Sequence, residues 1–282
     1  MPAATYVLTD FDRLGPWELE LATHLFLALK ADGIPVLNNP GAFRPRHAML
    51  EHFRAENLNS FRSWCPAYGQ MPNRFPVFLR SQAAHRGPIT DLIHDPGQAR
   101  AALEEALMSG HPLGDLQFIE YAAEALGEGF FQKHAAFRIG DTIVPALSVF
   151  SSGWAGKMNE DGRVPNHLYR RELNHIEDYP HRDSLMRVFR SANIDYGRID
   201  FGIVDGRIET YEINTNPWLG YIAPDPKGER PAVKAAVQAG YVKALRHIDT
   251  TSGDKSVRLT MEPFTTQRRK DRRWLWTRRW TP

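Results

Sequence analysis

Two runs of alternating apolar and polar residues, one on each side of an Asp-Gly pair, constrain this chain more than any other feature. They extend from Arg198 to Pro217 and read RIDFGIVDGRIETYEINTNP. A period of two is typical of β-strands, and Asp-Gly between two such runs is a strong signal for a tight turn. The pattern predicts an antiparallel hairpin that turns at Asp205-Gly206.

The register of that hairpin decides which side chains meet. Side chains alternate between the two faces of a strand, so Arg198 and Asp200 point to the same side of theirs. A two-residue turn would pair Asp200 with Tyr211 and send Glu212 and Asn214 to the opposite face of the sheet. A three-residue turn with a left-handed glycine shifts the pairing by one residue, and Asp200, Glu212 and Asn214 then converge. The Asp-Gly pair is compatible with both turns.

The oxygen-bearing side chains of the hairpin define the chemistry that a convergent register would support. Two carboxylates that face each other without a cation repel and raise a pKa. Two carboxylates with an amide oxygen form a hard ligand set suited to Mg²⁺, which usually keeps waters and substrate phosphates as further ligands. An arginine beside them could stabilise a transferring phosphoryl group. The alternative is an ordinary hairpin with a solvated polar face.

The rest of the chain mixes helical and strand patterns. Apolar residues at three- and four-residue spacing predict helices at 16–33, 44–58, 96–110, 181–193 and 231–248. Apolar runs predict strands at 4–11, 34–40, 74–81, 116–122, 130–140 and 140–150, the last two joined through Gly140-Asp141. Residues 151–178 look irregular and polar. Because the later strands join as hairpins, the pattern indicates an α+β fold with at least one mostly antiparallel sheet.

Length and composition exclude several classes of protein. The 282 residues suffice for one large or two modest domains, and 42% hydrophobic with 24% charged residues is ordinary for a globular protein. Apolar runs stay below the ~20 residues of a membrane span, and the start MPAATYVLTDFDRLG lacks the pattern of a secretory signal. Cys65 is the only cysteine, so we expect no intrachain disulfide and a reducing, cytoplasmic compartment.

The basic charge of the chain is concentrated at its end. From Arg268 the sequence RRKDRRWLWTRRWTP carries seven Arg or Lys and three Trp against one Asp, whereas the formal net charge of the whole chain is only +2. Such a segment could bind an anionic surface, either a membrane or a nucleic acid. The alternative is a disordered or self-docking tail, and residues from about 249 onward are expected to be loosely attached.

The hairpin resembles the C-terminal signature of the ATP-grasp superfamily. There an acid on one strand is followed across a hairpin by Glu-x-Asn-x-x-Pro, and here RIDFG precedes YEINTNP with the same order and spacing. Upstream, LNNPGAFRPRHAMLEHFRAENL is similar to the entry of the ATP-binding region, and FPVFLRSQAAHRGPIT to the strand and phosphate-covering loop of the small lobe. LQFIEYA is similar to the hinge strand whose backbone pairs with adenine, and KHAAFRIGDTIVPA to a hairpin that carries basic residues toward the phosphates. The resemblance spans roughly residues 36–217.

The resemblance implies a role for each matching residue. It implies that Asp200, Glu212 and Asn214 hold Mg²⁺ against ATP and that Arg198 acts catalytically on the transferring phosphoryl group. It implies ATP-binding roles for a further set of residues: Arg46, Arg80, Gly87, Glu120, Tyr121, Lys133 and Arg138. The family usually has lysines where this chain has Arg46 and Arg80, and its phosphate-covering loop is usually richer in glycine. Arginine binds phosphate in a bidentate fork, so the replacement preserves the charge and changes the geometry.

The family's organisation implies four segments in this chain. They are a shortened N-terminal α/β segment (1–44), a small lobe (45–118), a large lobe with the metal-binding hairpin (119–248) and the basic tail (249–282), with ATP clasped between the two lobes. The implied activity is an ADP-forming ligase that activates a carboxylate as an acyl phosphate for attack by an amine, both small molecules. The alternatives are a kinase on the same fold, or a nucleotide-binding scaffold that uses the tail and has no turnover.

Overall fold

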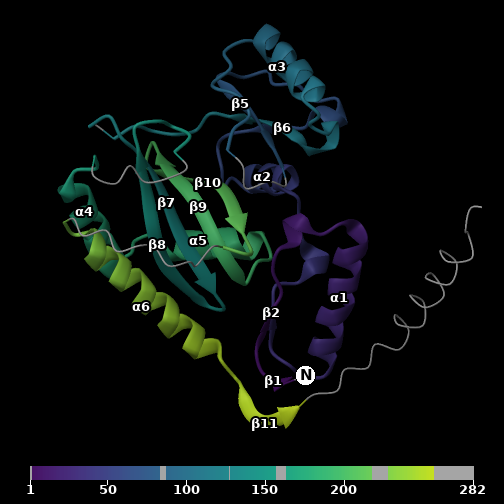
Figure 1. Cartoon of the computed structure of the whole chain (residues 1–282), viewed down its shortest axis with the longest axis vertical. Helices are drawn as coiled ribbons and strands as arrows, with labels where there is room; N and C mark the ends of the chain where they lie inside the picture. The colour runs from purple at the N-terminus through teal and green to yellow at the C-terminus, as the bar shows by residue number, and fades with distance from the viewer. Residues whose placement is uncertain (1, 83–86, 127, 157–162, 218–227, 257–282) are drawn as a thin grey trace, which may run out of the picture.

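A computed structural model describes residues 2–82, 87–126, 128–156, 163–217 and 228–256 of the chain (Figure 1). It contains both helices and largely antiparallel sheets, so the predicted α+β class is confirmed. The helices are α1 (Pro16–Ala31), α2 (Arg46–Ala55), α3 (Pro96–Met108), α4 (Asn166–Glu177), α5 (Arg182–Ser191) and α6 (Arg230–Ile248). The strands are β1 (Pro2–Ala3), β2 (Tyr6–Val7), β3 (Val36–Leu37), β4 (Ser63–Trp64), β5 (Val77–Ser81), β6 (Leu116–Glu120), β7 (Phe131–Ile139), β8 (Thr142–Ser151), β9 (Tyr196–Val204), β10 (Arg207–Asn214) and β11 (Ser252–Ser256).

The largest sheet has four antiparallel strands in the order β10-β9-β7-β8. Because neighbouring residues of a strand face opposite sides, the sheet buries two different apolar sets. Ala136 and Ile199 pack against α5 on one face. Phe137 and Val144 pack against α6 on the other. The sheet is thus a central layer between α5 and α6 (Figure 1).

A smaller sheet, in the order β4-β6-β5, lies beside the large one. Leu79 and Phe118 of its strands pack on α3, with Ala99 and Ala106 of that helix. Phe78 and Ile119 face the other way, toward the region where α2 and the β9–β10 hairpin lie. β6 belongs to this sheet along its whole length, so the sheet crosses the boundary predicted between residues 118 and 119.

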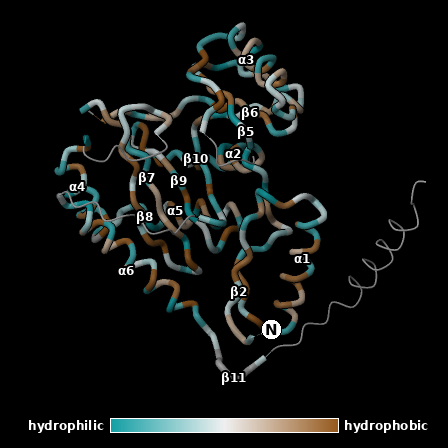
Figure 2. Tube along the Cα trace, in the orientation of Figure 1, coloured by the Kyte–Doolittle hydropathy of each residue, from teal (hydrophilic) through white to brown (hydrophobic). Residues whose placement is uncertain are grey.

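The N-terminal residues form a short β-α-β unit in which β2 and β3 are parallel and α1 connects them. Figure 2 shows the hydrophobic side of α1 turned toward β2, where Leu29 packs with Val36. Asn38, fully buried and left-handed at φ 64°, ties this unit to the large sheet. Its amide donates to the carbonyls of Leu8 and Tyr196, at 2.9 and 2.8 Å, and accepts from the N–H groups of Asp195 and Tyr196, both at 2.8 Å.

Two predictions about local structure are wrong. Residues 151–178 were expected to be irregular, yet α4 occupies Asn166–Glu177. Its buried stripe includes Leu168, Tyr169 and the charged Glu172, whose carboxylate pairs with Arg230 of α6 at 2.6 Å. Because an acidic residue takes an apolar position in the buried stripe, the sequence of this segment lacks the spacing of apolar residues that would predict a helix.

The chain after residue 249 was expected to be loosely attached, yet β11 pairs antiparallel with β1. The sequence of β11 is SGDKS, which contains no large apolar residue and therefore no apolar alternation that would indicate a strand. The basic segment beyond it, 257–282, lies outside the described residues. Among the helices of the described part of the chain, none has the length and apolar character needed to cross a membrane.

Candidate functional site

The β9–β10 hairpin turns through two residues and still brings its polar side chains to one face. Asp205 and Gly206 have φ values of 48° and 75°, the left-handed pair of a tight hairpin turn. Pairing runs regularly from Arg207↔Val204 to Thr210↔Phe201 and then steps to Glu212↔Asp200, so Tyr211 is an extra residue in a β-bulge. The prediction that a two-residue turn would separate Asp200 from Glu212 is therefore wrong.

The bulge restores the convergent register. Asp200 stands opposite Glu212 and Arg198 opposite Asn214, so all four side chains belong to the same face of the sheet. The sequence carried a signal for the extra residue. Ile208 and Ile213 both pack toward the core on α5, although their positions differ by five. In a regular strand an odd spacing puts two residues on opposite faces, so one residue must be inserted between them.

This face of the hairpin lines a pocket of about 450 Å³ between the two sheets. That volume lies within the usual ~300–1,000 Å³ of small-molecule sites. One end is apolar and aromatic, with side chains from β5, β6, β10 and the segment after β8. The other end is charged and is built by the hairpin, β7 and the end of β5. The aromatic end is lined by Phe61, Phe78, Ile119, Tyr121, Trp154 and Tyr211, and the charged end by Arg80, Lys133, Arg198, Asp200, Glu212 and Asn214.

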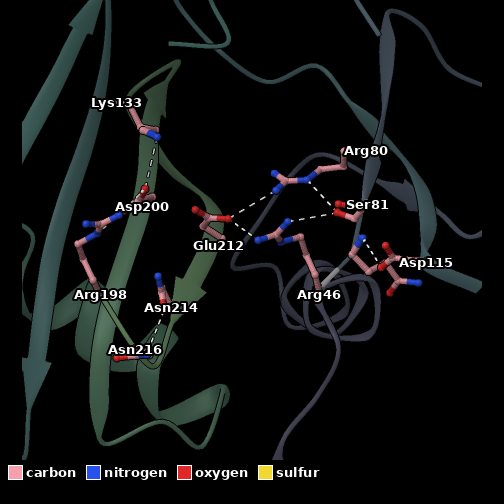
Figure 3. A network of polar contacts seen from close by, with 11 residues as sticks. Arg46, Arg80, Ser81, Asp115, Lys133, Arg198, Asp200, Glu212, Asn214 and Asn216 are labelled. Atoms are coloured by element: carbon pink, nitrogen blue, oxygen red, sulfur yellow. Dashed lines mark hydrogen bonds and ion pairs between the residues drawn. The ribbon is translucent and has the colours of Figure 1, made fainter. Parts of the chain in front are cut away.

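Asp200 lies between two cations at the charged end. Arg198 binds it through Nε and an Nη atom, at 2.8 and 3.3 Å to the two carboxylate oxygens. Lys133 Nζ lies 3.4 Å from Asp200 Oδ2 (Figure 3). Asp200 is 3% exposed, so its charge is compensated by these neighbours and not by bulk water.

Glu212 is likewise shared by two arginines from the other side of the pocket (Figure 3). Arg46, the first residue of α2, pairs with Glu212 Oε2, and Arg80 of β5 lies 3.7 Å from the same oxygen. Both guanidinium groups also donate to the carbonyl of Ser81, at 3.4 Å from Arg46 and 3.3 Å from Arg80. Burial, followed by the charge of Arg46, lowers the pKa of Arg80 to about 10, so Arg80 stays charged at neutral pH.

Four cationic side chains thus surround two carboxylates: Arg46, Arg80, Lys133 and Arg198 around Asp200 and Glu212. The surplus of positive charge suits an anion, and its spread on both sides of the carboxylates suits one with several oxygens, such as a polyphosphate. Asp200 and Glu212 are neighbours on one face of the hairpin, so they could share that anion only through a cation.

The ligand atoms of the hairpin fit a hard divalent cation. Asp200 and Glu212 offer carboxylate oxygens, and Asn214 offers an amide oxygen that accepts from the N–H of Asn216 at 2.8 Å and retains a second lone pair. Among the described residues, no group of three or more His, Cys, Asp or Glu side chains gathers as a metal site. A cation here would therefore take its remaining ligands from water or from the oxygens of a bound anion, as Mg²⁺ commonly does.

The aromatic end is shaped by contacts among its rings. The Trp154 ring lies 4.8 Å from that of Phe78 and meets the ring of Tyr121 edge-on at 5.8 Å. The N–H groups of Glu120 and Tyr121 donate to the carbonyls of Arg62 and Pro76, both at 2.9 Å. Those two donors are used within the protein, so a ligand in this end would meet ring faces and carbonyl oxygens of the strand.

Tyr211, the bulge residue, links the two ends and was not singled out from the sequence. Its hydroxyl donates to the carbonyl of Ala122 at 2.7 Å, and its ring covers Gly202. A Cβ at position 202 would come within 2.0 Å of the phenol oxygen, so only glycine leaves room for this ring. The signal in the sequence was the glycine itself, placed within a strand where close approach is its usual reason.

Most of the residues proposed from the resemblance lie at the pocket. The lining includes Gly87, Glu120 and Tyr121 along with the charged residues described above, and Arg46 reaches it through Glu212. The carboxylate of Glu120 accepts from the N–H of Arg62 at 3.0 Å and pairs with Arg74 at 2.9 Å. It therefore holds the small sheet together at the edge of the pocket.

The prediction that Arg138 faces the cleft is wrong. Its guanidinium donates to the carbonyls of Gly140 and Ile194, each at 2.8 Å, and pairs with Asp195 at 3.1 Å. Lys133, which does reach the pocket, is five residues away, and this odd separation places the two side chains on opposite faces of β7.

Comparisons with known proteins give matches in structure alone. No protein-family model matches the chain, and no curated protein matches its sequence. A D-alanine–D-alanine ligase from Bacillus anthracis resembles it with a TM-score of 0.44 and 13% identity, over 78% of this chain and 75% of that one. The corresponding ligase from Helicobacter pylori gives 0.43 and 11%, over 79% and 67%. The ATP-grasp ligase PsnB, in complex with a precursor variant, Mg and ADP, gives 0.43 and 12%, over 81% and 71%.

Proposed function

We propose that this protein is an ATP- and Mg²⁺-dependent ligase of the ATP-grasp type, which activates a carboxylate as an acyl phosphate for attack by an amine. One observation carries the proposal. The bulged register puts Asp200, Glu212 and Asn214 on one face, inside a pocket with cations at one end and aromatic rings at the other. This is the arrangement that the sequence signature RIDFG and YEINTNP requires in order to work as a metal and nucleotide site.

The two ends of the pocket suit the two parts of a nucleoside triphosphate. Phe78, Tyr121 and Trp154 provide ring surfaces for the base, and stacking of a base on an aromatic side chain contributes ~1–3 kcal/mol. Arg80 and Lys133 reach the charged end from opposite sheets and would bind the phosphates. With a small lobe at 45–118 and a large lobe at 119–248, the pocket would lie close to the boundary between the lobes, which runs through β6.

Residues of the hairpin would organise the reacting groups. Asp200, Glu212 and Asn214 would hold Mg²⁺, which when bound neutralises charge on the outer phosphates and orients them. Arg198 is half-buried beside Asp200 and would stabilise the charge that develops on the transferring phosphoryl group. Arg46 and Arg80 would exchange Glu212 for phosphate oxygens as the nucleotide enters, so Glu212 would be released for the cation.

The proposed reaction has two steps. A substrate carboxylate oxygen attacks the γ-phosphorus, forming an acyl phosphate as the bond to the bridging oxygen breaks and ADP leaves. The amine then attacks the acyl carbon, inorganic phosphate leaves, and the amine gives up a proton as the amide forms. Water would compete with the carboxylate for the phosphoryl group, so the first step requires that the bound substrates exclude water from the pocket.

A trapping experiment tests the proposal against its alternatives. ADP release is measured with panels of small carboxylates and amines, and hydroxylamine is added to intercept an acyl phosphate as a stable hydroxamate. We expect ADP and hydroxamate to appear together with the right carboxylate, and both to disappear in Asp200→Asn. ADP without hydroxamate would favour a kinase, and Mg²⁺-dependent ATP binding without any turnover would favour a scaffold. Absence of nucleotide binding would contradict all three.

A further inference from the structure

Asn59 lies directly behind the bulge that sets the register of the candidate site. It follows the C-terminal end of α2 and is 1% exposed. Its Nδ2 donates to the carbonyl of Thr210, and its Oδ1 accepts from the N–H of Thr210, both at 2.9 Å. Thr210 pairs with Phe201 and directly precedes the bulge residue Tyr211.

The position of β10 explains why this side chain matters. β10 is at the edge of the large sheet, so one side of its backbone has no neighbouring strand within that sheet. A primary amide offers one donor and one acceptor in the geometry of a peptide group, and Asn59 therefore pairs with Thr210 as a further strand would. The next residue, Ser60, donates its N–H to the carboxylate of Glu209 at 2.9 Å, so two consecutive residues hold β10 next to its bulge.

The same helix reaches the site from both of its ends. Arg46, at the start of α2, pairs with Glu212, and Asn59 follows its last turn and holds Thr210 two residues before Glu212. α2 is thus fixed against β10 on either side of the bulge. A bulge residue is left out of the ladder, and its position along the strand is free to shift unless something fixes it.

We propose that Asn59 is a positioning residue: its amide fixes the bulge at Thr210–Tyr211 and thereby holds Glu212 and Asn214 opposite Asp200 and Arg198. The apolar residues Ile208 and Ile213 require an extra residue somewhere between them, and Asn59 determines where it lies. The expected effect of Asn59 on affinity for a divalent cation rests on the proposed function. The expected effect of Asn59 on the local order of β10 does not depend on that function.

The test compares two buried asparagines. Asn59→Ala removes both bonds to Thr210. The control, Asn38→Ala, removes a buried amide that also bonds only to backbone but holds Leu8 and the start of β9, away from the bulge. Binding of ADP is measured without metal, Mn²⁺ binding is measured at saturating ADP, and hydrogen exchange is followed at residues 209–214. If Asn59→Ala does not fold, Asn59→Ser, which can keep one of the two bonds, replaces it.

We expect Asn59→Ala to weaken Mn²⁺ binding at least tenfold, to leave metal-free ADP binding within threefold, and to accelerate exchange at residues 209–214 more than tenfold. Asn38→Ala is expected to change none of these by more than threefold, even where it lowers global stability. A folded Asn59 variant with wild-type Mn²⁺ affinity and wild-type exchange would overturn the inference. If the wild type binds no Mn²⁺ with ADP, the proposed function fails, and the exchange at 209–214 alone then decides the role of Asn59.

Discussion

Replacing Glu212 by glutamine removes the carboxylate that two buried arginines share. The side chains of Arg46 and Arg80 are 9% and 11% exposed, and that of Glu212 is 18% exposed. Removing one partner of a buried ion pair usually costs ~3–5 kcal/mol, because the other charge is left uncompensated. Glu212 is not fully buried and the glutamine carbonyl can still accept a hydrogen bond, so we expect the free energy of unfolding to fall by ~2–3 kcal/mol. At ~2 °C per kcal/mol for a chain of this size, the melting temperature should fall by ~5 °C.

The same substitution should change nucleotide binding in opposite directions with and without metal. In the wild type a phosphate must displace Glu212 from Arg46 and Arg80, whereas in Glu212→Gln no carboxylate at position 212 competes with it. A charged hydrogen bond contributes ~1.5–3 kcal/mol, so metal-free ADP should bind about tenfold more tightly. ADP with Mg²⁺ should bind at least tenfold more weakly, because one metal ligand is lost.

Calorimetric titration with ADP in EDTA and in Mg²⁺, beside thermal unfolding of the free protein, measures all three quantities. Glu172→Gln is the matched control, because it removes a buried carboxylate that pairs with Arg230 away from the pocket. It should lower stability and leave both affinities unchanged. If Glu212→Gln weakens metal-free ADP as well, the carboxylate does not compete with phosphate for these arginines and the reasoning is refuted.

Three further predictions concern other parts of the molecule. Trp154→Ala should weaken nucleotide binding about tenfold, because it removes a ring on which the base would stack. Trp154→Phe should keep the affinity for ADP within threefold but abolish the change in tryptophan fluorescence that ADP causes. If that fluorescence change persists in Trp154→Phe, the nucleotide binds elsewhere. Burial, followed by the charges of His181, His175 and Arg171, lowers the pKa of His134 to about 3. His134 therefore binds a proton more readily in the unfolded state than in the folded state, and the free energy of unfolding should fall by ~2 kcal/mol between pH 7 and pH 5. His134→Phe should flatten that slope in urea titrations, and an unchanged slope would assign it to other groups. Arg138→Met should lower stability with ADP affinity unchanged, because the guanidinium pairs with Asp195 and two carbonyls remote from the pocket; a large loss of affinity would restore its phosphate role.

The sequence predicted the elements better than their relative placement. Helical spacing located α1, α2, α3, α5 and α6, because this pattern arises from burying one face of a helix. Apolar runs joined by Gly140-Asp141 located the β7–β8 hairpin, and period-two alternation located the β9–β10 hairpin. α4 was missed because its buried stripe includes Glu172, whose carboxylate is compensated by Arg230, 58 residues further along the chain, and by the N–H of Ser148.

The candidate site shows why register is hard to infer from a turn alone. Asp205-Gly206 was interpreted correctly as compatible with a two-residue turn, but the bulge at Tyr211 lay outside the turn and reversed its consequence. The spacing of Ile208 and Ile213 contained that information. The pairing of Arg46 with Glu212 joins residues 166 positions apart, and only the packing of α2 against β10 brings them together.

The central claim is that this bulged hairpin forms a divalent-cation site which requires a bound nucleotide. The most direct measurement is titration of Mn²⁺, followed by electron paramagnetic resonance, with and without saturating ADP, in the wild type, Asp200→Asn and Asn214→Ala. We predict one Mn²⁺ bound per chain only when ADP is present, with affinity reduced more than tenfold in each variant. Mn²⁺ binding that is equal in the wild type and both variants, or absent from the wild type with ADP, would contradict the claim.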